Sequence, residues 1–155
     1  MMLKNYYPRG DSTINVGETV SWNVNVNNMM GGSEYVSVRL RLDPTKTGSN
    51  DNVPSPYLEG HITEIEHVLM NNSTWTMPLD WTITSIDREE NNVRIRSLNA
   101  NGIDVNNLNV SSSSGSFRMV LELWRYDIES KNFVFYWSAA GDNRSAWNHI
   151  WFNVA

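Results

Sequence analysis

The chain has 155 residues, a length that suits one domain able to bury roughly 70% of the surface its unfolded form exposes. Its 12 Lys and Arg residues against 17 Asp and Glu residues give a net charge of −5. No basic block occurs, which argues against nucleic acid or an anionic membrane as a partner. No apolar run approaches the roughly 20 residues of a membrane span, so we expect no membrane insertion by this segment.

Cysteine is absent, which excludes disulfides and thiolate metal sites but does not decide the compartment. Residues 1–13 are predicted to form an irregular leader, with Tyr6, Tyr7 and Pro8 able to lie along a sheet edge. A short strand follows at residues 14–16, and Gly17 provides the next turn.

Residues 18–27 carry the clearest pattern in the chain. One side of this stretch is apolar and the other polar: Val20, Trp22, Val24 and Val26 alternate with Ser21, Asn23, Asn25 and Asn27. This period of two is typical of a strand with one face in a core and one in water. Residues 34–42 alternate in the same way, and Gly31 and Gly32 lie between the two stretches. The pair is therefore predicted to form a β-hairpin or meander.

The middle of the chain contains two stretches predicted as long loops, residues 43–56 and 99–116. Between them, residues 61–70 are interpreted as a strand rather than two turns of helix, because Ile and Thr dominate. Residues 73–84 alternate cleanly, but Pro78 cannot donate to a ladder, so the strand is expected to be at an edge or bulged there. A short strand is expected over residues 92–98.

The last third predicts three strands, over residues 117–127, 131–138 and 149–154, the first two paired through the Glu129-Ser130 turn. The side chains expected to point inward are Phe117, Met119, Leu121, Leu123, Phe133, Phe135 and Trp137. Eight or nine strands without a helix predict an all-β fold: a two-sheet antiparallel immunoglobulin-like β-sandwich with long loop insertions, in a single domain over residues 1–155.

Short segments at both ends and in the middle of the chain carry a family resemblance: residues 5–8 with 14–18, residues 22–28 with 35–38, residues 69–79, and residues 120–125 with 150–154. Together they resemble the extracytoplasmic domain of the archaeal family called domain of unknown function 1616. The motifs are mostly structural, and residues 43–56 and 87–116 depart from a minimal member. The resemblance implies an outward-facing accessory domain, often preceded by membrane helices, and it transfers no catalytic residue.

The sequence contains few signs of catalytic or metal-binding chemistry. His61, Glu64, Glu66 and His67 do not have the spacing of a zinc helix, and in a strand the two histidines would lie about 20 Å apart. The oxygen-rich residues 50–52 and 99–104 could suit calcium, but both lack a bidentate Glu and also fit ordinary Asn-Gly turns. No nucleophile elbow, phosphate loop or placed carboxylate pair occurs. We therefore expect no enzyme, no catalytic residue, no metal and no cofactor.

The best functional hint is aromatic. Trp124 and Tyr126 alternate away from the expected core face, as does Tyr136, so the three are predicted to form an exposed stripe with Arg118 and Glu122 near it. Such a stripe could anchor a protein interface or stack against sugar rings. The third possibility is that the leader or the loop over residues 43–56 covers these rings.

Asparagine is abundant, and four Asn-x-Ser/Thr sequons make glycosylation candidates of Asn71, Asn72, Asn109 and Asn143. These features favour an extracellular or cell-surface domain, either free or as the soluble part of a membrane-anchored protein. The sequence therefore predicts a non-catalytic interaction or assembly domain. Its expected partner is a protein, such as a surface-layer or membrane-complex component, and the alternative is a carbohydrate-binding module.

Overall fold

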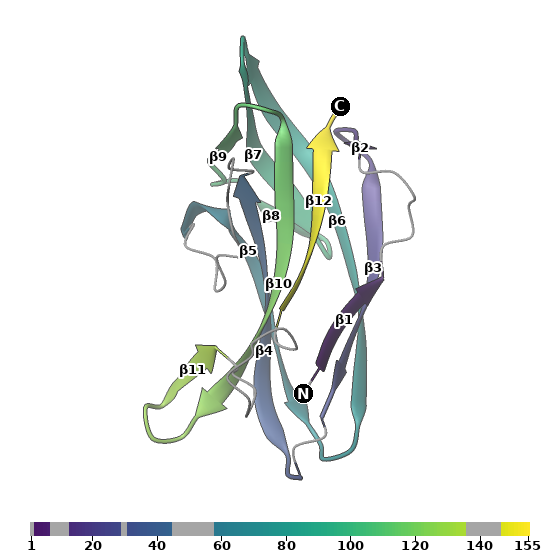
Figure 1. Ribbon diagram of the computed structural model, residues 1–155, viewed down its shortest axis with the longest axis vertical. Helices are drawn as coiled ribbons and strands as arrows, with labels where there is room; N and C mark the ends of the chain where they lie inside the picture. Colours follow the sequence, from purple (N-terminus) through teal and green to yellow (C-terminus); the bar gives the residue numbers. More distant parts are fainter. Residues whose placement is uncertain (1, 7–12, 29–30, 45–57, 136–146) are drawn as a thin grey trace.

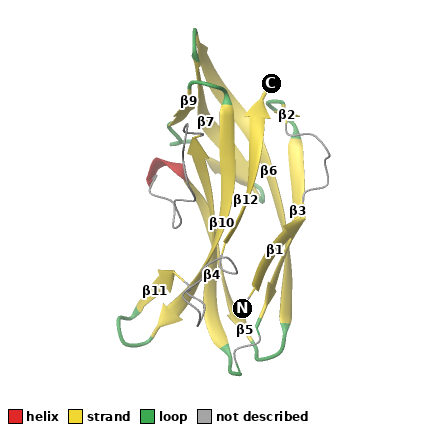
Figure 2. Cartoon of the chain, viewed as in Figure 1, coloured by secondary structure: helices red, strands yellow, loops and turns green. Residues whose placement is uncertain are grey.

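Two β-sheets make up the part of the chain that the computed structural model describes, residues 2–6, 13–28, 31–44, 58–135 and 147–155 (Figure 1). The first sheet holds β1 (Met2–Tyr6), β3 (Thr19–Asn27), β6 (Thr74–Glu89), β7 (Asn92–Ala100), β8 (Ile103–Val105) and β9 (Val110–Ser112). The second holds β2 (Thr13–Ile14), β12 (Trp147–Val154), β10 (Ser116–Asp127), β4 (Glu34–Pro44), β5 (His61–Leu69) and β11 (Asn132–Phe135). Figure 2 shows strands nearly throughout; the helical content of the described residues is one turn of 3₁₀ helix, η1 (Leu58–Gly60).

The two sheets bury their apolar faces against each other. In the middle of the core, the ring of Trp22 on β3 meets that of Trp81 on β6 edge to face at 5.7 Å between centroids. Trp81 reaches across to Phe152 on β12 at 5.4 Å, and Phe152 stacks on Phe117 of β10 at 5.9 Å. All four rings are at most 1% exposed. The alternation in residues 18–27 thus predicted the buried face correctly, and the two-sheet β-sandwich is confirmed.

The predicted hairpin between β3 and β4 is wrong. β3 pairs with β1 and β6 in the first sheet, whereas β4 pairs with β10 and β5 in the second. The chain between them crosses from one sheet to the other. Each strand has an apolar face of its own, and placing the two strands in opposite layers buries both faces against each other, which pairing them edge to edge does not do.

Asn28 fastens this crossing. Its side chain is fully buried, and its amide Nδ2 donates to the backbone oxygens of Gly32 at 2.8 Å and Leu69 at 2.9 Å. Its backbone N–H donates to the carbonyl of Ser73 at 2.9 Å. One residue therefore ties the β3–β4 crossing to the β5–β6 turn, where the chain crosses back to the first sheet.

We expect Asn28→Ala to lower the free energy of unfolding by about 1–3 kcal/mol, because the buried carbonyl of Leu69 and the partly buried one of Gly32 lose their donor. Urea unfolding measures the change. The neighbouring Asn27→Ala is the control: Asn27 accepts a hydrogen bond from Thr74 at the exposed surface, and its loss is expected to cost less than about 0.5 kcal/mol. Equal losses for the two variants would contradict a clamping role for Asn28.

Pro78 occupies a local edge, as its missing N–H predicts. At this position β6 pairs with β3 through Asn23, and the ladder to β7 begins only at Trp81. The Asn101 side chain caps the end of that ladder: its Oδ1 accepts from the Asp80 N–H at 2.8 Å. The strand over residues 61–70 is also confirmed, as β5.

Two stretches expected to be irregular contain strands. Within the leader over residues 1–13, β1 pairs antiparallel with β3, so Tyr6 does lie at a sheet edge; Tyr7 and Pro8 lie outside the described residues. Within residues 99–116, β8 and β9 both pair with β7. The β7–β8 turn is made by Asn101 (φ 49°) and Gly102 (φ 83°), the residue pair typical of a tight two-residue hairpin. Of the loop predicted over residues 43–56, Asp43 and Pro44 belong to β4, and residues 45–56 lie outside the described chain.

The strands over residues 117–127 and 131–138 do pair, as β10 and β11, but their register differs from the expected one. Phe135 lies directly opposite Trp124, and Phe133 opposite Tyr126. Opposed residues of an antiparallel pair project to the same side, so both phenylalanines share the face of the Trp and Tyr and not that of Leu121 and Leu123. In Figure 1 this hairpin projects at the lower left, beyond the point where β12 begins. Trp137 and Tyr136 lie outside the described residues.

Candidate functional site

The outer face of the second sheet carries a row of apolar side chains, one from each of four neighbouring strands. We call it the apolar row: Val68 (β5), Tyr35 (β4), Tyr126 (β10) and Phe133 (β11). Val68 lies opposite Tyr35, and Tyr126 opposite Phe133. In the middle of the row, the rings of Tyr35 and Tyr126 lie next to each other, with 6.0 Å between centroids. Three of the four side chains remain well exposed: Val68 by 56%, Tyr35 by 38% and Tyr126 by 36%.

The three aromatic rings of the apolar row contact one another. Phe133 lies 5.2 Å from Tyr35 and 5.5 Å from Tyr126, between ring centroids. The interplanar angles of the three pairs are 63°, 43° and 74°, so the rings are inclined to each other and form no common flat platform. Trp124 and Phe135 lie beside these rings, two residues away from Tyr126 and Phe133 on the same strands.

Trp124 is only partly exposed because neighbours enclose it. The guanidinium of Arg39 lies 4.1 Å from its ring centroid, a cation–π contact, and Phe135 packs edge to face at 5.6 Å. The indole Nε1–H points toward Glu122 Oε1 at 3.3 Å, and Arg39 itself pairs with Glu64 at 3.2 Å. The broad surface of this tryptophan is thus largely used within the domain.

Arg118 and Glu122 are buried, which corrects the expectation that they border an exposed stripe. Glu122 is 0% exposed and accepts from Arg41 Nε at 2.9 Å. Arg118 is 4% exposed, donates to Asp43 at 2.8 Å, and lies 5.4 Å from the ring of Trp151. Charged groups removed from water need such partners, so these two side chains are engaged within the sheet and are not available to a ligand in this structure.

The structure thus revises the list of candidate binding residues. Trp124 and Tyr126 do lie together, Tyr136 falls outside the described residues, and Tyr35, Phe133 and Val68 are additions. A binding role for any of them stays a prediction. Tyr35 could have been recognised from the sequence, because it alternates out of phase with the buried Val36 and Val38. Phe133 could not, since only the β10–β11 register places it.

The pKa of Tyr35 is shifted by its neighbour Glu66. The hydroxyl of Tyr35 donates a hydrogen bond to Glu66 Oε2, and this bond, followed by burial and the Glu66 charge, raises the pKa of Tyr35 above its usual value. The phenol therefore stays protonated, and a carboxylate is held at the border of the exposed rings.

His61 lies further along the same face, opposite Arg41. Burial lowers the pKa of His61 below 6.5, and the positive charge of Arg41 acts in the same direction. The unfolded chain then binds the proton first, so stability is expected to fall as the pH decreases below about 6.5.

We expect His61→Gln to weaken this pH dependence, since the variant has no imidazole to protonate. Thermal unfolding of both proteins at about pH 7.5 and about pH 5.5 measures it: the wild type should lose more of its melting temperature between the two conditions. The same decrease in both proteins would show that His61 does not supply the dependence.

The oxygen-rich residues 99–104 bond to one another within the β7–β8 turn. Asn99 Oδ1 accepts from the Gly102 N–H at 3.0 Å, and its Nδ2 donates to Asp104 at 2.8 Å, so these groups close the β7–β8 turn. Among the described residues there is no group of three His, Asp or Glu side chains arranged to hold a metal. Residues 50–52, the other calcium candidate, lie outside them. No helix in the described part of the chain has the length and hydropathy of a membrane span.

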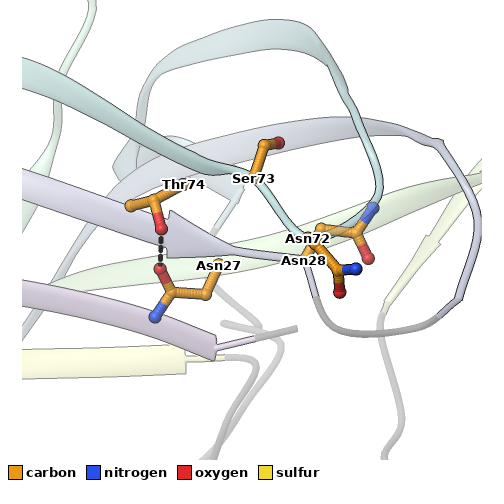
Figure 3. A pocket seen from close by; sticks show the side chains of 5 residues that line it. All are labelled: Asn27, Asn28, Asn72, Ser73 and Thr74. Carbon is orange, nitrogen blue, oxygen red and sulfur yellow. Dashed lines mark hydrogen bonds between the residues drawn. The ribbon is translucent and has the colours of Figure 1, made fainter.

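A polar hollow of about 300 Å³ lies beside the β5–β6 turn, lined by Asn27, Asn28, Asn72, Ser73 and Thr74 (Figure 3). Its lining is uncharged, and part of it already forms internal bonds: Thr74 Oγ1 donates to Asn27 Oδ1 at 2.6 Å, as the dashed line shows. Such a lining offers no acid, base or nucleophile pair for catalysis. Of the four sequons, Asn71, Asn72 and Asn109 have exposed side chains, and Asn143 lies outside the described residues.

No protein-family model and no curated protein matches the chain. Among solved structures, the CARDB domain of the PF1109 protein from Pyrococcus furiosus, in complex with di-metal ions, superposes with a TM-score of 0.51. The match covers 99% of this chain and 90% of that chain at 11% identity. The fold is an immunoglobulin-like β-sandwich. At this identity the likeness establishes the fold alone, and membership in the domain of unknown function 1616 family stays a prediction.

A β-glucosidase from Listeria innocua, solved with gluconolactone and with glucose, also matches this sandwich. Both structures have a TM-score of 0.42 over 98% of this chain, at 13% and 10% identity, and the match covers 16% of the enzyme chain. A likeness this slight transfers neither activity nor ligand.

Proposed function

We propose that this domain is a non-catalytic interaction module that acts outside the cell and binds a protein partner through the apolar row. The observation that carries the proposal is the continuity of that row across β5, β4, β10 and β11, with Val68, Tyr35 and Tyr126 exposed. An apolar surface built from neighbouring strands, rich in tyrosine and bordered by charged groups, has the composition of a protein interface.

The ring geometry supports a protein partner over the alternative of a glycan. A sugar ring stacks on a flat exposed aromatic face. The ring of Trp124 is covered by Arg39 at 4.1 Å. The three rings of the apolar row, those of Tyr35, Tyr126 and Phe133, are inclined to one another by 43° to 74°. Inclined rings instead form an uneven surface into which side chains of a partner can pack.

An extracellular location, on an archaeal cell surface as the family resemblance suggests, completes the proposal. It is supported by the exposed sequon residues Asn71, Asn72 and Asn109. Labelling intact cells of the source organism with a membrane-impermeant amine reagent tests it directly. Labelling of the full-length protein only after lysis would overturn this part of the proposal.

Site-specific photocrosslinking tests the interface. The domain carries p-benzoylphenylalanine in place of Tyr126 or, as a control, in place of Ile103, which is even more exposed and lies on β8 of the other sheet. With an envelope fraction as the source of partner, we expect a protein adduct from position 126 and none from position 103. Excess wild-type domain should abolish the adduct, whereas excess Tyr35→Ser/Phe133→Ser domain should not.

The same experiment can fail clearly. Equal adducts from both positions, or equal competition by the wild-type and double-variant domains, would show that the apolar row is not the interface. Circular dichroism of the double variant confirms that it is folded.

The glycan alternative has its own measurement. Tryptophan fluorescence is followed while oligosaccharides are added to the wild type and to Trp124→Ala. We expect no saturable change in either. A saturable change in the wild type that is lost in the variant would favour the carbohydrate-binding alternative.

A further inference from the structure

We propose that the exposed rings of Tyr35 and Tyr126 bind a basic side chain, a lysine or arginine that the protein partner presents. The inference rests on the proposed function and specifies the chemistry of the partner. It follows from three observations: the ring arrangement, the carboxylate beside it, and a cation that the domain's own structure already holds in an equivalent place.

The rings provide the first part of the argument. The face of an aromatic ring is negative, and a cation within about 6 Å of its centroid is attracted to it. Tyr35 and Tyr126 are inclined by 63° with 6.0 Å between centroids, so one bound cation can contact both rings. Among the described residues, no Lys or Arg side chain lies over either tyrosine. Both rings therefore offer exposed negative surface.

Glu66 provides the second part. It accepts the hydroxyl proton of Tyr35 in a hydrogen bond, which pushes electron density toward the ring and strengthens its attraction for a cation. The carboxylate is itself exposed and stands next to the ring. The strand ends and the β10–β11 turn add further negative charge: Glu34, Asp127 and Glu129 outnumber Arg125 and Lys131. The electrostatic surroundings thus favour a positive partner.

Arg39 provides the third part. Its guanidinium lies 4.1 Å from the Trp124 centroid and 6.0 Å from that of Phe133, and it pairs with Glu64. This arrangement combines aromatic rings, a cation between them and a carboxylate on β5. Tyr35, Tyr126 and Glu66 repeat the rings and the carboxylate, with Glu66 two residues further along β5 than Glu64. The second combination has the rings and the carboxylate, and the partner would contribute the cation.

Two synthetic peptides test the inference. One is an acetylated and amidated repeat of alternating glycine and lysine, and the other is the same peptide with every lysine ε-acetylated. Acetylation removes the charge and keeps most of the stem. NMR of the domain with isotope-labelled tyrosine follows both titrations. We expect the basic peptide to shift the ring signals of Tyr35 and Tyr126 and to bind at least about fivefold more tightly than the acetylated one.

Variants locate the effect. Glu66→Gln and Tyr126→Leu are each expected to raise the dissociation constant of the basic peptide about fivefold. Glu89→Gln is the matched control: it removes the same charge from an exposed glutamate at the distant β6–β7 end and should leave the constant unchanged. Because Glu89→Gln and Glu66→Gln change the net charge equally, a difference between them separates local recognition from general attraction to a negative protein.

Three results would overturn the inference: no binding by the basic peptide, equal binding by both peptides, or equal effects of Glu66→Gln and Glu89→Gln. These results are distinct from failure of the proposed function. If photocrosslinking at position 126 succeeds while the two peptides bind equally, the apolar row is an interface that does not select a cation. If crosslinking fails as well, the interface itself is elsewhere.

Discussion

Trp81→Ala is expected to lower the free energy of unfolding by about 3–5 kcal/mol, a large part of the total stability of a domain of this size. Trp81 is 1% exposed and joins the two sheets, since its ring contacts Trp22 at 5.7 Å in its own sheet and Phe152 at 5.4 Å in the other. Removing the indole leaves a cavity between two rigid layers, which can collapse only partly.

Two further variants make this measurement specific. Trp151 is 39% exposed on the outside of the second sheet, so Trp151→Ala should cost less than about 1 kcal/mol. Trp81→Phe keeps an aromatic ring between the sheets and removes an indole N–H that has no hydrogen-bond partner in the described structure. It should cost well under half of what Trp81→Ala costs. Urea unfolding of the three variants checks this order, and equal losses for Trp81→Ala and Trp151→Ala would refute it.

The second large effect concerns the buried ion pair of Asp43 and Arg118. Asp43→Ala is expected to lower the free energy of unfolding by about 3–5 kcal/mol. The two residues lie directly opposite each other on β4 and β10, with 2.8 Å between carboxylate and guanidinium and exposures of 2% and 4%. Removing the carboxylate leaves a positive charge that is shielded from water without its neutralising partner.

A double-mutant cycle of Asp43→Leu, Arg118→Met and the variant that carries both separates the pair from its parts. The double variant Asp43→Leu/Arg118→Met replaces both charges by apolar groups and should recover most of the loss, because neither charge remains to be desolvated. Asp87→Ala is the surface control, since Asp87 and Arg96 pair at 3.5 Å with exposures near half. It should change stability by less than about 0.5 kcal/mol. Losses that add without coupling in the Asp43 and Arg118 variants would contradict the argument.

The alternation of apolar and polar residues is sufficient to predict which face of a strand is buried. The alternation of Val20, Trp22, Val24 and Val26 predicts a buried strand face, and all four are buried. A strand has a period of two whatever it pairs with, so such a face can be read from the chain alone. The Asn101-Gly102 pair is a second local signal, because its two positive φ angles make the β7–β8 turn. The prediction of a loop over residues 99–116 does not use that signal.

The partners of each strand could not be read in this way. β3 and β4 look like a hairpin because they are neighbours in sequence, but they lie in different sheets. The amide of Asn28, bonded to Gly32 and Leu69, is what holds the crossing, and nothing local distinguishes this asparagine from the others nearby. Long-range pairing depends on the sum of contacts over the entire domain.

The chemistry of the outer face shows the same division. The sequence by itself determined an all-β chain with alternating faces, and it indicated that Trp124 and Tyr126 lie away from the inner face, because side-chain direction is a local property of a strand. Only the tertiary structure decided that Arg118 and Glu122 are buried in ion pairs, and that Tyr35, Val68 and Phe133 join Tyr126 in one row. Those facts depend on the register between strands far apart in the chain, which the alternation within a single strand does not contain.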